Sequence, residues 1–323
     1  MNVDISVIIC TYNRSRSLSA VLQSLGQMAV PQDISWEVIV IDNNSMDDTK
    51  EVTVHFSKVA FEVKYVFESV QGLSHARNRG VEESQGNILS FIDDDVLVAT
   101  DWLWEVNNAF KQYQVACVGG RVPLQGDVTK PHWWHPDYDN AVGACDKGDQ
   151  VIIADANYPG LIGIGANLSF TRACFEKYGN FRTDLGRIGS SLLMGEEAEF
   201  CNRLKTHGEL LMYYPNAVVY QCPSMDRMSR QYVRRWFFRI GEWLYVQDGL
   251  LKVNVDHRVK LLLGVPRWMY KVAAKNVGSL IGQYCIGRQQ AAFHNAMQFT
   301  TFLGYVYGSV KHRLFQKQKS WSH

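Results

Sequence analysis

Paired cysteines and a long apolar leader are both missing from this chain of 323 residues. The seven cysteines are scattered, and none stands in a C-x-x-C pair. An odd number of scattered cysteines argues against a disulfide framework and against a zinc site, and it favours a reducing compartment. The N-terminus has no basic segment, and the apolar run Ile5–Cys10 is too short for the core of a signal peptide. We therefore expect this run to be a buried strand.

Acidic residues are scarce in the C-terminal third of the chain. Residues 225–323 contain 16 Lys and Arg but only 4 Asp and Glu, a net charge of +12. Residues 1–224 contain 17 and 28, a net charge of −11, so the total of +1 hides a strong contrast. A basic region attached to an acidic body predicts an anionic partner, with nucleic acid and anionic lipid as the two candidates.

The sequence offers no convincing membrane-spanning helix. Residues 289–310 carry no Asp, Glu, Lys or Arg, but they include three glutamines, a histidine, an asparagine and two threonines. Their length would suffice to cross a bilayer, and their polarity argues against it. Residues 256–287 look like a basic amphipathic helix pair interrupted at Pro266. We expect residues 256–315 to lie in a membrane interface, with Phe293, Met297 and Tyr307 near one face. The alternative is a helical cap packed on the N-terminal domain, or a dimer contact.

Strand-like and helix-like segments alternate through the first 122 residues. The predicted strands are 5–10, 36–41, 62–67, 88–92 and 116–122, and the predicted helices are 15–27, 47–56, 73–84 and 101–113. Strands separated by helix-length segments predict right-handed β-α-β units and a mostly parallel sheet. Residues 123–164 are irregular, and further elements follow at 165–170, 171–178, 196–207 and 218–222. The length permits one large α/β domain with an appendage or two domains. We expect a boundary between residues 224 and 225, followed by a basic helical region.

Polar side chains follow three of the predicted strands. Thr11, Asp42 and Asp93 each fall just past a strand end. Sheets of this class bind ligands at the carboxyl ends of their strands. These three groups are therefore expected to converge on one edge of the sheet.

Three consecutive aspartates, Asp93, Asp94 and Asp95, concentrate negative charge at this edge. Carboxylates placed this close repel one another, and a divalent cation that bridges to a phosphate would offset the repulsion. Mg²⁺ and Mn²⁺ favour carboxylate oxygens and keep coordination positions open for substrate phosphates. The alternative is a solvated acidic loop that caps the following helix.

Six motifs, taken together, resemble those of family 2 glycosyltransferases with the GT-A fold. The resemblance spans roughly residues 4–240 and rests on Thr11-Tyr12-Asn13-Arg14, Asp42-Asn43-Asn44-Ser45, Gly72 with Ala76-Arg77-Asn78-Arg79-Gly80, Asp93-Asp94-Asp95, Gly165-Ala166-Asn167 and Gly195-Glu196-Glu197. Each motif is weak alone, but six in the right order at the right strand ends are a strong signal. The resemblance implies a Rossmann-like, mostly parallel α/β sheet flanked by helices, with residues 1–224 as the nucleotide-sugar-binding and catalytic domain.

The resemblance implies that Thr11 and Asp42 hold the base and ribose of a nucleotide-sugar. A buried carboxylate that accepts from a base N–H rejects bases without that donor. Arg77 could reach the base or the diphosphate. The alternatives are an N-cap or Asx turn for Asp42 and a surface salt bridge, worth little, for Arg77. The same nucleotide-binding motifs contain Tyr12, Asn13, Arg14 and Asn44.

Small residues would let the sugar pass close to the backbone at Gly165, Ala166 and Asn167. The alternative for this motif is an ordinary turn or β-bulge.

Under the same resemblance the aspartate triplet is the D-x-D motif. Asp93 would contact the ribose and a metal-bound water, and Asp95 would ligate Mg²⁺ or Mn²⁺ directly. The ion would bridge the two phosphates and neutralise the leaving nucleoside diphosphate. Asp94 either points toward solvent or substitutes for Asp93. Many relatives have a His just after the strand that ends here at Tyr220, whereas this chain has Gln221, a much poorer ligand.

The family carries an acidic pair whose second member is the catalytic base. Glu197 takes that position here, with Glu196 as the alternative. The base would remove the proton of the acceptor hydroxyl as that oxygen attacks the anomeric carbon. A carboxylate in a dry cleft could have a raised pKa. The alternative is that these first-turn acids only complement the helix dipole. One base without a second nucleophile matches a single displacement with inversion.

We therefore expect an inverting, metal-dependent glycosyltransferase. It would transfer a sugar from a nucleotide-sugar to a hydroxyl of a lipid-linked or polysaccharide glycan, at the cytoplasmic face of a membrane and without nucleic acid. A nucleotidyltransferase is the first rival, but Thr11–Ser15 lacks the glycines of a phosphate-binding loop. A non-catalytic anion binder that uses the basic tail is the second. It leaves the acidic strand-end cluster unexplained, because those charges would repel the phosphates of a nucleic acid.

Overall fold

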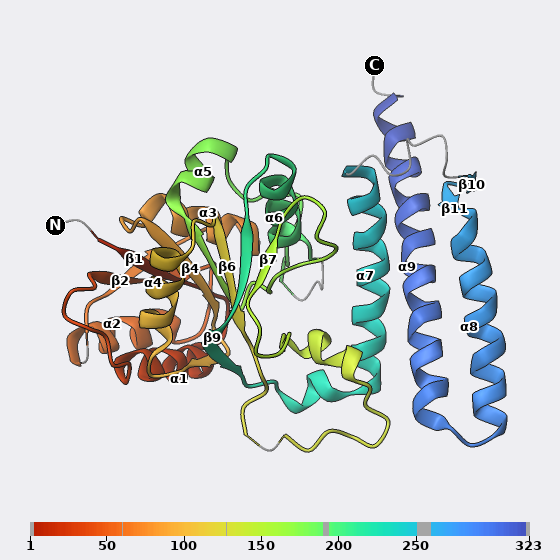
Figure 1. Ribbon diagram of the computed structural model, residues 1–323, viewed down its shortest axis with the longest axis horizontal. Coiled ribbons are helices and arrows are strands. Elements are labelled where there is room, and N and C mark those ends of the chain that lie inside the picture. The colour runs from red at the N-terminus through yellow and green to blue at the C-terminus, as the bar shows by residue number, and fades with distance from the viewer. Residues whose placement is uncertain (1–2, 60, 127, 190–193, 251–259, 321–323) are drawn as a thin grey trace. The chain divides into compact units, whose positions relative to one another are not determined.

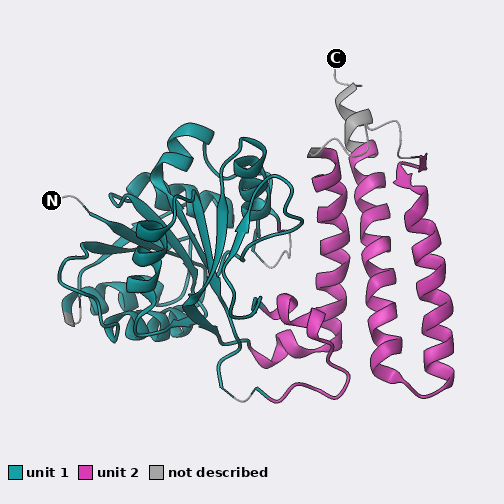
Figure 2. Cartoon of the chain, viewed as in Figure 1, with its two compact units in different colours: residues 1–128, 143–191, 195–223 teal, residues 129–142, 192–194, 224–323 magenta. Residues whose placement is uncertain are grey.

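The computed structural model describes residues 3–59, 61–126, 128–189, 194–250 and 260–320. The chain divides into two compact units (Figure 2). Unit 1 comprises residues 1–128, 143–191 and 195–223. Unit 2 comprises residues 129–142, 192–194 and 224–323. Part of the irregular insert after residue 122 therefore packs with the C-terminal helices.

Unit 1 is built on a sheet with the strand order β3-β2-β1-β4-β8-β6-β9-β5, in which β7 also pairs with β9 (Figure 1). Four neighbouring strands are parallel: β1 (Ile5–Thr11), β2 (Trp36–Asp42), β3 (Val63–Phe67) and β4 (Ile88–Asp93). Further along, β6 (Cys117–Arg121) is parallel to β9 (Leu211–Gln221). The predicted α/β class is confirmed.

Other strands of the sheet run antiparallel to their neighbours. The alternation of strand and helix segments in the sequence did not predict this direction. β8 (Asn167–Thr171) lies between β4 and β6 and runs antiparallel to both. The short strands β5 (Val96–Val98) and β7 (Ile152–Ala154) both pair antiparallel with β9. Hydrophobic periodicity is a local signal and carries no information on which strand is the neighbour. The insertion of β8 beside β4 therefore could not be predicted from it.

Helices cover both faces of the sheet, because side chains along each strand alternate between the faces. Val7 and Ile9 face one core, which includes α1 (Ser15–Gly26), α2 (Thr49–Val59) and α4 (Trp102–Gln112). Ile8 faces the other core, which includes α3 (Leu73–Glu83), α5 (Arg172–Tyr178) and α6 (Glu196–Thr206). The strands at the centre are buried on both sides and therefore have nearly continuous apolar sequences.

The register of the parallel strands aligns their carboxyl ends. Thr11 pairs with Asp42 across β1 and β2, and Cys10 pairs with Asp93 across β1 and β4. The predicted convergence of Thr11, Asp42 and Asp93 on one edge is therefore confirmed.

Unit 2 contains three long helices. α9 (Gln289–Ser320) packs against both α7 (Arg230–Leu250) and α8 (Arg267–Cys285) (Figure 1). A Cβ atom on Gly304 would lie 1.9 Å from the carbonyl oxygen of Phe238, so the close approach of α7 and α9 requires glycine there. Smaller elements are η1 (Pro136–Val142), η2 (Met225–Met228), β10 (Leu261–Leu262) and β11 (Val265–Pro266).

Two expectations about this region are wrong. The segment 256–287 is not a helix pair: residues 256–259 lie outside the described residues, β10 and β11 form a hairpin, and α8 alone is helical. Phe293 and Met297 do not share an outward face with Tyr307. They are 7% and 1% exposed and pack inside unit 2, whereas Tyr307 is 45% exposed. Among the described residues, no helix combines the length and the apolar character needed to cross a bilayer.

Candidate active site

The aspartate triplet is arranged around a buried central member. Asp94 is 5% exposed, and its carboxylate accepts hydrogen bonds from Thr11 Oγ1 at 2.8 Å and from Arg14 Nη1 at 2.8 Å. Arg14 Nη1 also lies 3.0 Å from Oδ2 of Asp95, and the side chain of Asp93 is 41% exposed. The structure therefore decides the question that the sequence left open: Asp94 points inward and anchors the triplet to the first motif.

Burial and the charge of Asp95 raise the pKa values of the other two aspartates. Burial raises the pKa of Asp94 to about 6, with Asp95 adding to the shift and Arg14 opposing it. Burial and the charge of Asp95 likewise raise the pKa of Asp93. A set of oxygen donors that repel one another suits a hard divalent cation such as Mg²⁺ or Mn²⁺. These residues therefore fit the metal that the sequence predicts.

Gln221 lies beside the predicted metal ligand. Its Nε2 donates to Oδ1 of Asp95 at 3.1 Å, while its Oε1 is buried and has no hydrogen-bond partner among the described residues. Gln221 ends β9 opposite Val96, which places it next to Asp95 by register. Sequence reasoning considered this residue only as a poor ligand and missed it as a hydrogen-bond donor.

Asp42 is buried, and each of its oxygens accepts a hydrogen bond from within the chain. The backbone N–H of Ser45 donates to Oδ1 and the hydroxyl of Tyr65 donates to Oδ2, both at 2.8 Å. The pKa of Tyr65 is raised by burial and by this carboxylate. Asp42 thus makes the Asx turn that was the alternative to ligand binding. This turn lies at the sheet edge where the ligand is predicted to bind. Tyr65 was not singled out, because a tyrosine inside a predicted strand gives no separate signal.

The first two motifs are joined by hydrogen bonds around two asparagines. Asn13 and Asn44 have φ angles of 52° and 67°, in the left-handed region where Asn is tolerated. Asn13 Oδ1 accepts from the N–H of Met46 at 2.7 Å, and its own N–H donates to Ser45 Oγ at 2.9 Å. Asn13 and Asn44 are exposed and Tyr12 is half-buried, so this part of the edge is open to solvent.

Arg77 is a buried charge that contacts three carboxylates. Its side chain is 4% exposed, and its Nη1 donates to Glu196 and lies 3.5 Å from Oε2 of Glu197. Its Nη2 lies 3.9 Å from Oδ1 of Asp93. The alternative of a surface salt bridge is wrong for Arg77. The guanidinium instead connects the triplet to the acidic pair.

The two members of the acidic pair differ in exposure and charge. Glu196 and Glu197 begin α6 directly after Gly195, whose φ is 113°, and their side chains are 3% and 21% exposed. Burial, followed by the charge of Glu197, raises the pKa of Glu196 to about 8. Burial also disfavours ionised Glu197, but the charge of Arg77 and the interaction with Glu196 outweigh it and lower its pKa. At neutral pH the proton is therefore on Glu196, and Glu197 is a charged acceptor.

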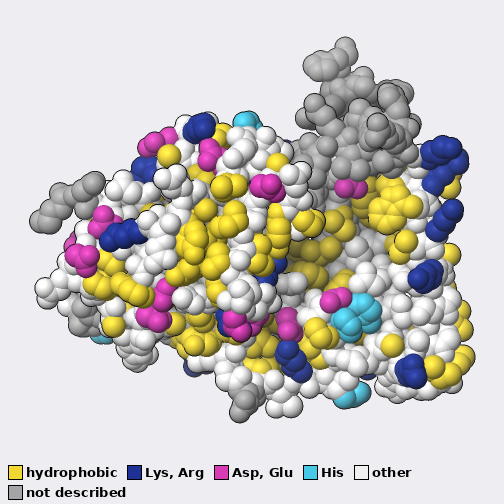
Figure 3. Space-filling model, in the orientation of Figure 1, with side chains coloured by type: hydrophobic (Ala, Val, Ile, Leu, Met, Phe, Trp, Pro, Cys, Tyr) yellow, Lys and Arg dark blue, Asp and Glu magenta, His cyan; other side chains and the backbone are white. Residues whose placement is uncertain are grey.

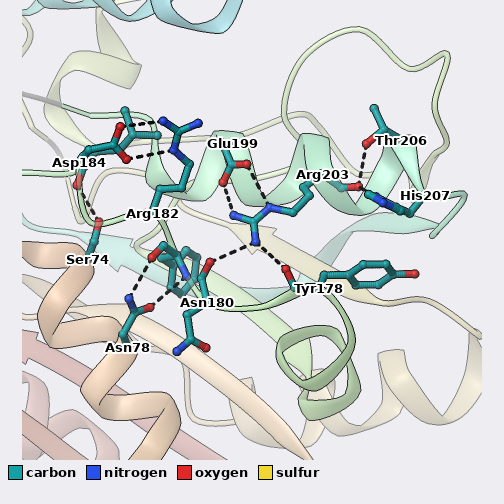
Figure 4. Close-up of polar contacts among 12 residues, drawn as sticks. Ser74, Asn78, Tyr178, Asn180, Arg182, Asp184, Glu199, Arg203, Thr206 and His207 are labelled. Atoms are coloured by element: carbon teal, nitrogen blue, oxygen red, sulfur yellow. Dashed lines mark hydrogen bonds and ion pairs between the residues drawn. The ribbon is translucent and has the colours of Figure 1, made fainter. Parts of the chain in front are cut away.

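Hydrogen bonds hold α3 and α6, which carry Arg77 and the acidic pair, in fixed relation (Figure 4). Arg203 of α6 is paired with Glu199 and donates to the carbonyls of Tyr178 at 2.7 Å and Asn180 at 3.1 Å. Asn78 of α3 exchanges two hydrogen bonds with the backbone of Phe181, at 2.9 and 3.0 Å. The segment between α5 and α6 is thus tied to both helices.

The Gly165-Ala166-Asn167 motif is divided between the site and the core. A Cβ atom on Gly165 would lie 2.1 Å from Nη2 of Arg77, so only glycine allows the guanidinium its position. Ala166 is 1% exposed in the hydrophobic core. Asn167 accepts from Trp102 Nε1 at 3.0 Å and donates to the carbonyl of Ala217 at 2.8 Å. Ala166 and Asn167 are thus each 1% exposed and offer almost no surface to a ligand.

The chain is similar to known proteins over most of its length. A glucosyl-dolichyl phosphate glucuronosyltransferase of Haloferax volcanii is 26% identical over 333 aligned positions, which cover 97% of this chain and 98% of the relative. The succinoglycan biosynthesis protein ExoM of Rhizobium meliloti is 27% identical over 245 positions, which cover 75% and 74% of the two chains.

The fold is shared with a solved structure of the mannosyltransferase PcManGT of Pyrobaculum calidifontis, in complex with GDP-Man and Mn²⁺. Its TM-score is 0.60 at 19% identity, over 98% of this chain and 88% of that chain, and it confirms the predicted GT-A fold. The model of the family described as "Glycosyl transferase family 2" matches residues 6–179, more than half of the chain. This chain therefore belongs to glycosyl transferase family 2, and it is a glycosyltransferase.

Proposed function

We propose that this glycosyltransferase is inverting and metal-dependent, and that it transfers a sugar from a nucleoside diphosphate sugar to a hydroxyl of a lipid-linked or polysaccharide glycan. One observation carries the proposal. Arg77 is buried between Asp93, at 3.9 Å, and the acidic pair, with Glu197 at 3.5 Å. The proposed metal ligand Asp93 and the proposed catalytic base Glu197 therefore both lie beside the positively charged guanidinium of Arg77.

The donor would bind at the carboxyl ends of β1, β2 and β4. Thr11, Asp42 and Arg77 would approach the nucleoside and diphosphate, as the family resemblance implies, with Tyr12, Asn13, Arg14 and Asn44 lining the exposed part of the edge. The exposed carboxylate of Asp93 is available to a ribose hydroxyl. Binding of GDP-Man by PcManGT, which shares the fold, supports a nucleotide-sugar as the ligand class.

Mg²⁺ or Mn²⁺ would be held by Asp95, with Asp93 as the second ligand. When bound, such an ion neutralises the leaving diphosphate. The N–H of Gln221 fixes the orientation of the Asp95 carboxylate, as outer-shell partners of metal ligands commonly do. Both oxygens of Asp94 already accept hydrogen bonds, one from Thr11 and one from Arg14. Asp94 would therefore hold the triplet in place rather than ligate the ion.

Glu197 would be the catalytic base. It is ionised at neutral pH and partly exposed, so it can accept the proton of the acceptor hydroxyl. As that proton leaves, the acceptor oxygen forms a bond to the anomeric carbon and the bond from this carbon to the diphosphate oxygen breaks. Attack from the side opposite the leaving group inverts the configuration. Glu196 would keep its proton and hold Arg77, whose Nη1 also lies 3.5 Å from Oε2 of Glu197.

The enzyme would meet its acceptor at a membrane surface, and part of residues 256–315 would contact that surface. Residues 260–313 contain no Asp or Glu. On the first half of α8, Trp268, Lys271, Val272 and Lys275 recur at helical spacing and are all exposed. Lys and Arg side chains line the edge of unit 2 in Figure 3. This mixture suits an anionic lipid surface.

Two further observations support this setting. The printed name of the Haloferax volcanii relative refers to a glucosyl-dolichyl phosphate. The seven cysteines are all free thiols, which agrees with the cytoplasmic side of the membrane.

The proposal is tested with a panel of nucleotide-sugars, with and without Mn²⁺, read by thermal shift and by release of nucleoside diphosphate. We expect one donor to raise the unfolding temperature only when Mn²⁺ is present. We also expect Asp95→Ala to abolish this Mn²⁺ dependence and Glu197→Ala to retain it without turnover. Full turnover in either variant would overturn the mechanism.

A further inference from the structure

Unit 2 contains a group of possible metal ligands that plays no part in the proposed active site. His135 and Asp137 lie at the start of η1, and His294 lies on α9. Nδ1 of His135 is 3.6 Å from Oδ1 of Asp137, and Nε2 of His294 is 3.7 Å from Oδ2 of the same carboxylate. One donor atom from each residue lies within 4.8 Å of the other two. Two segments distant in sequence thus bring two imidazoles and one carboxylate together.

His294 is poorly satisfied as a hydrogen-bonding group. Its Nδ1 is buried without a partner among the described residues, and its Nε2 makes a long 3.5 Å contact with the amide nitrogen of Gln298 besides lying 3.7 Å from Asp137. The two imidazole rings are stacked with centroids 3.9 Å apart, which disfavours two positive charges. Neutral imidazoles keep a lone pair free to bind a metal.

We propose that His135, Asp137 and His294 bind a zinc ion. Zn²⁺ takes imidazole and carboxylate ligands in tetrahedral geometry, and three protein ligands leave the fourth position to water. Bonds of about 2.0–2.1 Å place tetrahedral donors about 3.3 Å apart. The distances of 3.6 and 3.7 Å, each to a different oxygen of Asp137, are close to this value, and the donor atoms all lie within 4.8 Å of one another.

Closing the site requires the stacked rings to tilt apart, because each ring must direct a nitrogen at the same ion. The exposed side chains can supply that movement. His135 is 32% exposed and Asp137 is 54% exposed, so both can turn without repacking the interior. His294 is held within α9 and would stay in place.

The ion would fasten residues 129–142 to α9 within unit 2. This segment is already attached there, because Trp133 and Tyr138 pack on Phe293, and Gln290 donates to the carbonyl of Trp134. Zinc would strengthen this attachment and raise the stability of unit 2 with the logarithm of its concentration once that exceeds the dissociation constant. The cysteine pattern predicted no zinc site. That reasoning concerned cysteine ligands, and the group found here uses histidine and aspartate.

The test is a titration of the untagged full-length protein with Co²⁺, a spectroscopic substitute for Zn²⁺. We expect one equivalent to develop the visible bands of four-coordinate cobalt and Zn²⁺ to displace it. His135→Ala and His294→Ala should weaken binding at least tenfold. His132→Ala is the matched control, because His132 is exposed in the same segment and lies outside the group. Its binding should be unchanged.

Three outcomes would overturn the zinc site. The first is an unchanged spectrum and affinity in His294→Ala. The second is loss of the bands in Asp95→Ala, which would place the cobalt at the D-x-D aspartates. His135→Gln, at a half-buried position, guards against misfolding as the cause of a loss. Its metal-free unfolding temperature should equal that of the parent while binding is lost, and retained binding would also contradict the proposal.

Discussion

Nε2 of Gln221 lies 3.1 Å from Oδ1 of Asp95, so a neutral amide orients the carboxylate that we propose as the metal ligand. Gln221→Ala removes this donor and leaves the carboxylate in place. We expect the Mn²⁺ concentration for half-maximal rate to rise at least about tenfold, because outer-shell partners are commonly worth about 10- to 100-fold in metal affinity. At saturating Mn²⁺ the maximal rate should fall much less. A rate titration against Mn²⁺ measures both quantities.

Tyr220→Phe is the control for this experiment, since Tyr220 is the neighbouring residue of β9 and is 38% exposed. It should leave the Mn²⁺ dependence unchanged. An equal shift in both variants would show that the strand end, and not the amide of Gln221, controls the metal.

Asp94 and Asp95 are expected to respond differently to the same substitution. Asp94→Ala removes the buried carboxylate that accepts hydrogen bonds from Arg14 and Thr11. It should lower the free energy of unfolding by about 1.5–3 kcal/mol, the usual worth of a hydrogen bond to a charged group. The lower part of this range applies, because Arg14 is 40% exposed and can still be hydrated. Asp95→Ala should destabilise the protein less, because its contacts with Arg14 and Gln221 are longer, at 3.0 and 3.1 Å, and it should abolish metal-dependent turnover. Urea unfolding and rate measurements distinguish the two, and equal destabilisation would contradict the anchoring role of Asp94.

The strand-end aspartates show what could be predicted from the sequence. Regular spacing placed Asp42 and Asp93 after strands, and parallel register then brought them together, so the edge was predictable. The inward direction of Asp94 was not, because it depends on Thr11 and Arg14 being within reach in space. The amide of Gln221 comes from β9, whose pairing with β5 is a long-range antiparallel contact without a local signal.

The C-terminal region shows a different limit of prediction. Phe293 and Met297 were placed on an outward face by helical spacing alone. In the structure they are buried by residues 129–142 and by the other helices of unit 2. Amphipathic spacing identifies an apolar stripe and does not say whether protein or lipid covers it.

The two members of the acidic pair should have different roles, with Glu197 as the base and Glu196 as a supporting residue. Glu197→Gln removes the proton acceptor and retains nearly the same shape. We expect the maximal rate to fall by about 10²- to 10⁴-fold, the usual worth of general base catalysis, while the thermal shift caused by the donor persists. Glu196→Gln is the matched control. It should lose less activity, because Glu196 is already protonated at neutral pH. A larger loss in Glu196→Gln would exchange the two roles.

Glu196 should also make stability depend on pH. Its pKa is about 8 in the folded protein and 4.5 as the ordinary value. A raised pKa means that the folded state binds the proton more tightly, so its contribution is fully present below about pH 4.5 and is lost as the pH rises through about 8. Glu197, with a lowered pKa, acts in the opposite sense and only below its ordinary value.

We expect the free energy of unfolding to decrease by on the order of a few kcal/mol between about pH 6 and pH 9, and Glu196→Gln to flatten this slope. Asp94, whose pKa is about 6, contributes mainly below this range and equally in both proteins. Urea unfolding across the range measures the slope. A parallel decline in the parent and in Glu196→Gln would assign the effect to another group.

The exposed stripe on α8 should bind anionic vesicles. Trp268→Ser and Val272→Ser each remove a large apolar side chain that is 58% or 46% exposed. Because burying such a side chain is worth roughly 1.5–3 kcal/mol, each change should weaken binding about tenfold or more in a flotation or sedimentation assay. Lys271→Glu and Lys275→Glu should weaken it most at low salt, since screening already reduces the attraction at high salt.

Trp104→Ser is the control, because Trp104 lies on α4 of unit 1 and is 42% exposed. The stripe is excluded as the contact if binding survives the α8 changes, or if Trp104→Ser lowers it equally. Turnover of a water-soluble acceptor should be unaffected throughout, which separates membrane binding from the chemistry at Glu197.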